Sequence, residues 1–258
     1  MFGRVAAWRA AALLVFVLAA FLPATASAQW QWALAAIDVA PPSDQTLMAA
    51  EPFGMRAVPV TSGGLLEKWT GVEAEIGADR EVLARCRAGA AGCPAAAQKF
   101  LAVVAEGRAL AGRSRIGVIN RAINMAIRPM SDLAQWGVPD RWSAPLETFS
   151  TGRGDCEDYA IAKYVALREA GVAEQDLRLV VVRDLALNQD HAVITARISG
   201  KWMVLDNRWL TLVEDTDLRH VVPLFVLDRE GVKQLTPTAV ADAQRAPAPA
   251  AAPGSLGF

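Results

Sequence analysis

The hydrophobic period of this chain changes near residue 177, and that change limits the fold more than any other feature. Four earlier segments carry apolar residues at helical spacing: 65–76, 80–87, 95–110 and 115–127. After residue 177 come short β-branched runs, LRLVVVRD, HAVITARI and KWMVLDNRW. Helices followed by strands predict an α+β fold, in which a helical N-terminal layer packs on an antiparallel sheet.

The first 28 residues have the features of a secretory signal peptide. Arg4 and Arg9 precede the apolar run AALLVFVLAAFL, and the small residues 26–28 suit cleavage after Ala28. A retained anchor helix is the alternative, but the run of about a dozen residues is short for a bilayer span. We therefore expect an exported, periplasmic protein.

The remaining sequence predicts one domain between two irregular ends. Residues 29–50 contain Pro41 and Pro42 and are expected to be a flexible lead-in. Residues 51–235 form the domain, and the Ala/Pro-rich residues 236–258 are expected to be a disordered tail. The 26 basic and 27 acidic residues almost cancel, so the chain has no overall attraction for nucleic acid.

Three cysteines are informative in an exported chain, because thiols in an oxidising compartment tend to pair. Cys86 and Cys93 are close in sequence and form a disulfide if their Cα atoms are close enough; otherwise they are two unpaired small residues. Cys156 is left over, which suggests a reactive or protected thiol.

Cys156 falls at the expected start of a helix that stops at Gly171. Gly152 and Gly154 allow a tight approach to this helix, and Asp155 suits its N-cap. Unpaired N–H groups and the macrodipole at a helix start lower a thiol pKa and favour the nucleophilic thiolate. A small buried cysteine beside ordinary capping residues is the alternative.

A hairpin supplies the partners that a thiolate needs. A two-residue turn at Ser199 and Gly200 makes His191 and Asp206 diagonal neighbours on one face, so that imidazole and carboxylate meet. A register slip of one residue would separate them. His220 has no comparable partner and is expected to be a surface or packing histidine.

These segments together resemble a known family. GDCEDYAIAKYVALREAG, DHAVITAR and WMVLDN, with the upstream INRAIN and WGVPDRWSAPLETFSTGRG, are similar to the bacterial transglutaminase-like cysteine proteinases of the LapG type. The resemblance covers roughly residues 50 to 232. It implies a papain-like fold, with Cys156 as nucleophile, His191 as general base and acid, and Asp206 orienting the imidazole.

The resemblance also implies calcium, held by the acidic residues beside the nucleophile, Asp155 and Glu157. Carboxylates beside a thiolate raise its pKa unless a cation neutralises them, and calcium prefers such oxygen ligands. Asp158 either joins the site or stabilises the helix start. A solvated acidic cap without metal is the alternative.

The family's substrate and partner follow from the same resemblance. It implies cleavage of a large surface adhesin near its N-terminus, at paired alanines, and sequestration by an inner-membrane cyclic-di-GMP receptor of the LapD type. Nothing in the chain suggests direct nucleotide binding. Trp136, Trp142 and Trp209 are candidates for the partner surface. Two alternatives stay open, a transglutaminase-like acyltransferase and a non-catalytic calcium-binding adaptor.

Overall fold

The computed structural model of the chain describes residues 38–39 and 51–238. The expected signal peptide, most of the expected lead-in and nearly all of the expected tail lie outside the described residues. None of the helices in the described part is both long and apolar enough to cross a membrane.

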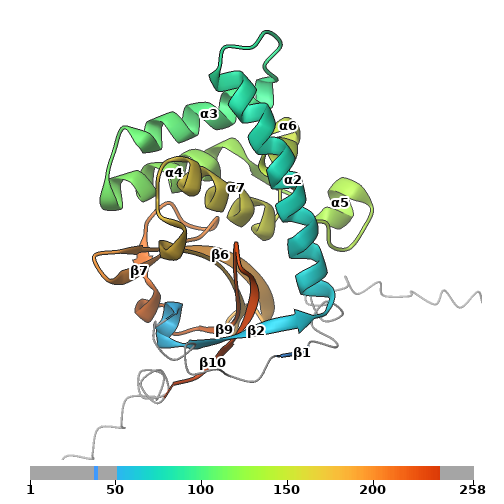
Figure 1. Cartoon of the computed structure of the whole chain (residues 1–258). Coiled ribbons are helices and arrows are strands. Elements are labelled where there is room, and N and C mark those ends of the chain that lie inside the picture. Colours follow the sequence, from blue (N-terminus) through green and yellow to red (C-terminus); the bar gives the residue numbers. More distant parts are fainter. Residues whose placement is uncertain (1–37, 40–50, 239–258) are drawn as a thin grey trace, which may run out of the picture.

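Helices stack against one side of a curved sheet, as Figure 1 shows. The helices are α2 (Gly64–Arg87), α3 (Ala95–Arg108), α4 (Gly112–Ala126), α5 (Asp132–Trp136), α6 (Pro145–Thr151) and α7 (Cys156–Glu169). Short 3-10 turns cover Pro52–Gly54, Glu174–Asp176 and Asp215–Asp217. The predicted α+β fold with an antiparallel sheet is therefore confirmed.

The main sheet has eight strands in the order β1-β2-β10-β9-β5-β6-β7-β8, and every neighbouring pair is antiparallel. Its strands are β1 (Asp38–Val39), β2 (Arg56–Ser62), β5 (Leu177–Asp184), β6 (Gln189–Ile198), β7 (Lys201–Leu205), β8 (Val213–Glu214), β9 (Val221–Asp228) and β10 (Gly231–Thr236). Two further strands, β3 (Arg128–Pro129) and β4 (Arg153–Gly154), form a small parallel pair.

The hairpin β6–β7 has the predicted register. Ile198 pairs with Lys201 across the turn, and Ile194 pairs with Leu205 at the end of the ladder. Ser199 and Gly200 both have positive φ, 50° and 81°, the backbone shape that a two-residue turn between twisted strands requires. The turn therefore fixes which residues at the open end of the hairpin share a face.

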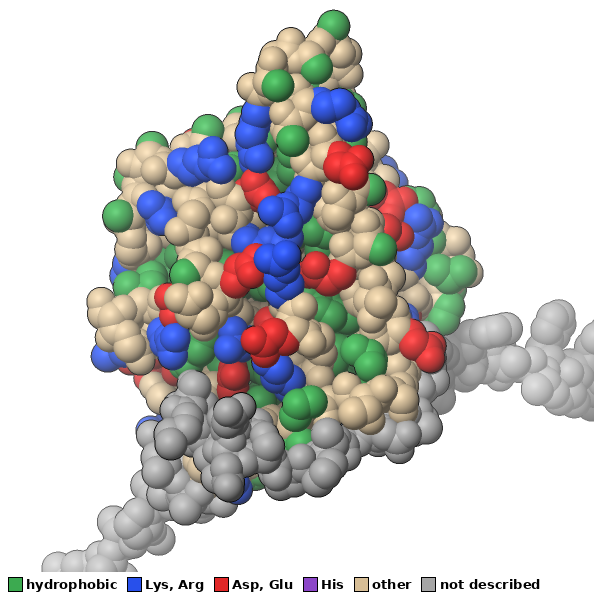
Figure 2. All heavy atoms as spheres, viewed as in Figure 1, with side chains coloured by type: hydrophobic (Ala, Val, Ile, Leu, Met, Phe, Trp, Pro, Cys, Tyr) green, Lys and Arg blue, Asp and Glu red, His purple; other side chains and the backbone are tan. Residues whose placement is uncertain are grey.

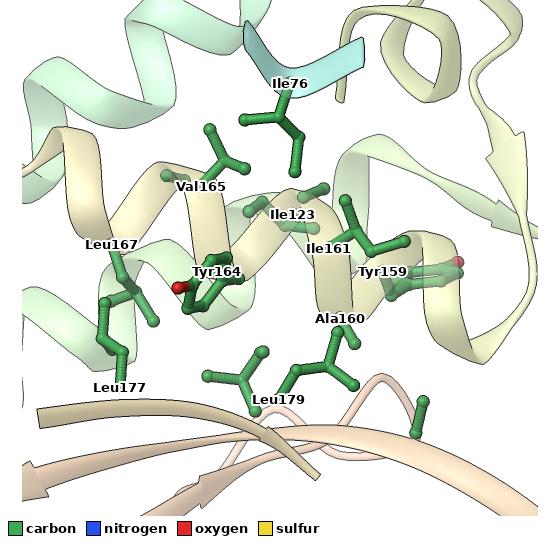
Figure 3. Close-up of a cluster of buried hydrophobic side chains, with 14 of the residues drawn as sticks. Ile76, Ile123, Tyr159, Ala160, Ile161, Tyr164, Val165, Leu167, Leu177 and Leu179 are labelled. Carbon is green, nitrogen blue, oxygen red and sulfur yellow. The ribbon is translucent and has the colours of Figure 1, made fainter. Parts of the chain in front are cut away.

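Helix α7 is the centre of the molecule. Figure 3 shows its side chains between the neighbouring helices and strand β5. Ala160, Ile161, Tyr164 and Leu167, which recur at helical spacing, are buried, but so is every other residue from 157 to 167. A helix covered on all sides needs no polar face. The residues at its N-terminal end are thereby held by packing from several directions.

Two predicted segmentations differ from the structure. Segments 65–76 and 80–87 form the single helix α2, which continues without a break through residues 77–79. Residues 128–154, for which the sequence predicts no regular element, contain β3, α5, α6 and β4. These elements are too short for hydrophobic periodicity to reveal them.

The C-terminal end of α2 is joined to neighbouring elements by a disulfide and an ion pair. Cys86 and Cys93 form a disulfide with a Cα–Cα distance of 5.2 Å, which closes the turn between α2 and α3. Figure 2 shows basic and acidic side chains interleaved on this face. Arg87 at the end of α2 pairs with Glu169 at 2.6 Å. The charges here are matched locally and do not form a patch of one sign.

Candidate active site

A cleft of about 350 Å³ opens where the first turn of α7 meets the beginning of β6. The 129–131 segment and the residues just after β7 complete its walls. Its lining residues are Pro129, Met130, Ser131, Asp155, Cys156, Glu157, Gln189, Asp190, His191, Asn207 and Arg208. Residues that are distant in sequence, including the predicted nucleophile and the predicted base, therefore share one small space.

Cys156 is the first residue of α7, where it was predicted to be. Gly152 ends α6 with φ +64°, a conformation that favours glycine. At Gly154 a Cβ would lie 2.5 Å from the Oδ2 atom of Asp158, so a side chain there would collide with it. Two glycines thus let the chain turn sharply into the helix that carries the thiol.

The predicted histidine–carboxylate contact is present. His191 Nε2 lies 2.9 Å from Asp206 Oδ1, and both residues are buried. The backbone N–H of Arg208 donates to the same oxygen at 2.9 Å. Burial would raise the pKa of Asp206, but the hydrogen bond from His191 and its charge hold that pKa below the usual value. Since Nε2 is engaged, Nδ1 is the nitrogen left to exchange a proton with a thiol.

The electrostatics of the thiol differ from the expectation of a lowered pKa. Burial raises the pKa of Cys156 well above its usual value, and the charges of Glu157 and Asp155 raise it further. The thiol donates a hydrogen bond to Glu157 Oε2 at 3.1 Å. A backbone hydrogen bond from Ala192 acts in the opposite direction. Burial, together with the nearby carboxylates, therefore outweighs the effect of the helix end on the thiol pKa.

Three carboxylates form a cluster beside the thiol. Asp132, Asp155 and Glu157 each offer an oxygen, and these oxygens lie within 4.8 Å of one another. Burial and the charge of Asp155 raise the pKa of Asp132 to about 7, and the same two causes raise the pKa of Glu157. Like charges this close repel unless protons or a cation neutralise them, so the donor set fits a hard divalent ion.

Asp132 was not among the predicted ligands. It begins α5, and its carboxylate accepts a hydrogen bond from the N–H of Arg141. The pair β3–β4 folds the chain back so that residue 132 reaches the start of α7: Met130 N–H donates to Gly154 O at 2.9 Å. The available signal was an acidic residue three positions after Pro129, in the connection that leads to the nucleophile.

The other predicted acidic residues have distinct places. Asp155 occupies the N-cap position, but its side chain makes no capping hydrogen bond and joins the cluster instead. Asp158 lies outside the group of three carboxylates. Its Oδ1 accepts the Ser143 N–H at 2.9 Å, which fixes the preceding connection against α7. Of the two roles considered for Asp158, this contact matches the structural one.

The three tryptophans named for a partner surface are not equivalent. Trp142 is buried and packs edge-on against Trp69, with ring centroids 6.4 Å apart. Trp136 is partly exposed and lies beneath the guanidinium of Arg141. Trp209 is partly exposed and contacts His220, which is a packing histidine here. Only the partly exposed pair is available to a partner.

The fold and the cleft define a class of enzyme. A thiol at the start of a central helix, in one cleft with the histidine of a histidine–aspartate pair from an antiparallel sheet, is the arrangement of papain-like and transglutaminase-like thiol enzymes. A family model described as bacterial transglutaminase-like cysteine proteinase matches residues 82–222. The chain belongs to this family and is a cysteine peptidase.

Two solved structures with TM-scores above 0.5 give the same fold. LapG of Legionella pneumophila is 20% identical, with a TM-score of 0.51 over 65% of this chain and 92% of LapG. The EGTA-treated form of that protein is 21% identical, with a TM-score of 0.51 over 62% and 86% of the two chains. Its calcium-bound form matches with a TM-score of 0.41, at 21% identity over 56% and 96%. Comparison with curated proteins gives no match.

Proposed function

We propose that the protein is a calcium-dependent cysteine endopeptidase that works through a Cys156–His191–Asp206 triad. The observation that carries the proposal is the shared cleft, lined by Cys156 and by an imidazole already oriented by a carboxylate. His191 Nδ1 takes the thiol proton as sulfur attacks the peptide carbonyl, and it returns that proton to the leaving amine. Water, deprotonated by the same nitrogen, then hydrolyses the thioester.

Calcium is proposed on the chemistry of the three carboxylates. Asp132, Asp155 and Glu157 would hold the ion through oxygen atoms, the ligands that calcium prefers. A bound ion would neutralise the charges that keep the pKa of Cys156 high. Glu157, which accepts the thiol hydrogen in this structure, then no longer competes with His191 for that proton.

Location, substrate and partner are proposed from the sequence. The N-terminal signal pattern supports export to the periplasm. The family resemblance supports a large surface adhesin, cut near its N-terminus to control biofilm attachment, and an inner-membrane LapD-like cyclic-di-GMP receptor as regulator. The partly exposed Trp136, with Leu133 three residues earlier in α5 at 64% exposure, is the apolar surface that we propose for this receptor.

Peptide cleavage tests the proposed reaction. Peptides with paired alanines should be cleaved by the calcium-loaded protein, and Cys156→Ala or His191→Ala should lose nearly all activity. Asp206→Ala should lose less, because Asp206 orients the base and does not itself react. An added amine distinguishes hydrolysis from acyl transfer, because hydrolysis gives a free carboxylate and acyl transfer gives an amide of the added amine. Undiminished cleavage by Cys156→Ala would exclude the thiol mechanism.

Calcium titration tests the metal site. Asp132→Asn should weaken calcium binding measured by calorimetry, and chelator should abolish cleavage. Asp176→Asn is the matched control, because that carboxylate pairs with Arg197 at 2.8 Å away from the cleft. Equal calcium affinity in both variants would show that Asp132 is not a ligand.

A further inference from the structure

Two asparagines on α4 contact the segment that follows β7. Asn124 Nδ2 donates to the backbone oxygens of Asp206 and Trp209, both at 2.9 Å. Asn120 Nδ2, one turn earlier, donates to the Trp209 oxygen at 3.1 Å. Both acceptors are carbonyl oxygens, so the amide nitrogens must face them. The two side chains therefore close the four-residue segment 206–209 against α4.

The surroundings of Asn120 and Asn124 indicate that these residues are present for the hydrogen bonds that their amide nitrogens donate. Asn120 is fully buried, on a helix whose other buried residues are three isoleucines. The Oδ1 atoms of Asn120 and Asn124 are buried with no hydrogen-bond partner among the described residues. A buried acceptor without a partner is unfavourable, and an aliphatic side chain would avoid it. Compared with an aliphatic side chain, the amides contribute the hydrogen bonds to the 206–209 segment.

That segment has little other support from the sheet. The β6–β7 ladder ends at Leu205, and β8 pairs only with Met203 and Val204. Asp206 therefore lies one residue beyond the last rung. Its carboxylate must nevertheless meet His191 Nε2 at 2.9 Å. A carbonyl held by Asn124 fixes the peptide plane from which that carboxylate projects.

We propose that Asn124, assisted by Asn120, is a positioning residue for catalysis: it holds the Asp206 backbone so that the carboxylate orients His191. This proposal rests on the proposed triad mechanism. Neither asparagine is among the residues that line the cleft, so we assign them a role through Asp206. Removal of the amide lets the segment shift, which should lower turnover and leave substrate affinity almost unchanged.

Thiol alkylation provides a readout that needs no substrate. Cys86 and Cys93 are joined, so Cys156 is the one free thiol of the chain, and iodoacetamide reports on it alone. With calcium present, Asn124→Ala should lower the alkylation rate at neutral pH about tenfold and shift its pH profile towards alkaline pH. Cleavage of a peptide should show a similar fall in kcat with unchanged KM.

Controls separate positioning from folding. Arg113→Ala removes another α4 hydrogen bond to the same connection, to Leu212 O at 2.9 Å, and should leave both rates unchanged. In an Asp206→Asn background, Asn124→Ala should have no further effect, because Asn124 acts only by positioning the Asp206 carboxylate. If Asn124→Ala does not fold, Asn124→Ser takes its place, because serine supplies a hydroxyl donor on a shorter side chain.

The outcomes are distinct. Equal losses from Asn124→Ala in the wild-type and Asp206→Asn backgrounds, or a loss as large in Arg113→Ala, would overturn the positioning role. An unchanged alkylation profile in Asn124→Ala would also overturn it. If the wild type cleaves no peptide, the proposed proteolysis fails, and the alkylation experiment still decides the role of Asn124.

Discussion

Lys163 is a buried base behind the active site, and it allows a quantitative test. It lies on α7 with 1% of its surface exposed, and its Nζ is 5.9 Å from the centroid of the Tyr159 ring. Its ammonium group makes no hydrogen bond among the described residues. Burial lowers the pKa of Lys163 to about 7, although the charge of Asp206 acts to raise it. We predict that Lys163→Met stabilises the protein in a pH-dependent way.

The magnitude follows from linkage. A shift from 10.5 to about 7 corresponds to roughly 5 kcal/mol at 1.36 kcal/mol per unit, the unfavourable free energy of burying the charge below pH 7. Between pH 7 and pH 10.5 the unfolded chain binds this proton and the folded protein does not. The contribution of Lys163 to the free energy of unfolding therefore becomes less unfavourable as pH rises. Between pH 6 and pH 9 the benefit of Lys163→Met should shrink by about 2.7 kcal/mol.

Urea unfolding at pH 6 and pH 9, followed by tryptophan fluorescence, measures this difference. Lys99→Met on the exposed side of α3 is the control, and its effect should be the same at both pH values. A Lys163→Met effect that is equal at pH 6 and pH 9 would refute the reasoning. A larger benefit at pH 9 would reverse its sign and refute it as well.

Three further predictions concern stability and the metal. Replacing Cys86 and Cys93 with serine should lower the free energy of unfolding by roughly 2 kcal/mol, measured by urea titration, with peptide cleavage kept; no change would mean that the disulfide does not stabilise the fold. Gly154→Ala should destabilise by about 1–3 kcal/mol and reduce activity, whereas Gly77→Ala, with open space around it, should be neutral or stabilising by up to ~1 kcal/mol. Because the pKa of Asp132 is raised to about 7, protons compete with calcium below that pH, and calorimetry should show at least about tenfold weaker binding at pH 6 than at pH 8; equal affinities would contradict its role as a ligand.

The parts of the site that sequence predicts are those set by local geometry. His191 and Asp206 belong to one hairpin, so a two-residue turn was enough to place them on the same face. Cys156 marks the point where the chain enters a helix with a clear apolar pattern. Both placements depend on contacts between residues that are near each other in sequence.

The parts that sequence did not predict depend on distant contacts. Asp132 reaches the cleft through the two-residue pair β3–β4, which has no periodic signal. The raised pKa of Cys156 depends on its burial as well as on the adjacent carboxylates. Whether Cys86 and Cys93 bond depended on a Cα distance that only the packing of α2 against α3 decides.

The burial of α7 on every side has a consequence for how the enzyme loses activity. A helix enclosed by other elements can exchange its amide hydrogens only when most of the domain opens. Local fraying is thus a poor route to displacing the nucleophile. Heat inactivation and global unfolding should therefore coincide, and the thiol should be among the last groups to leave its native surroundings.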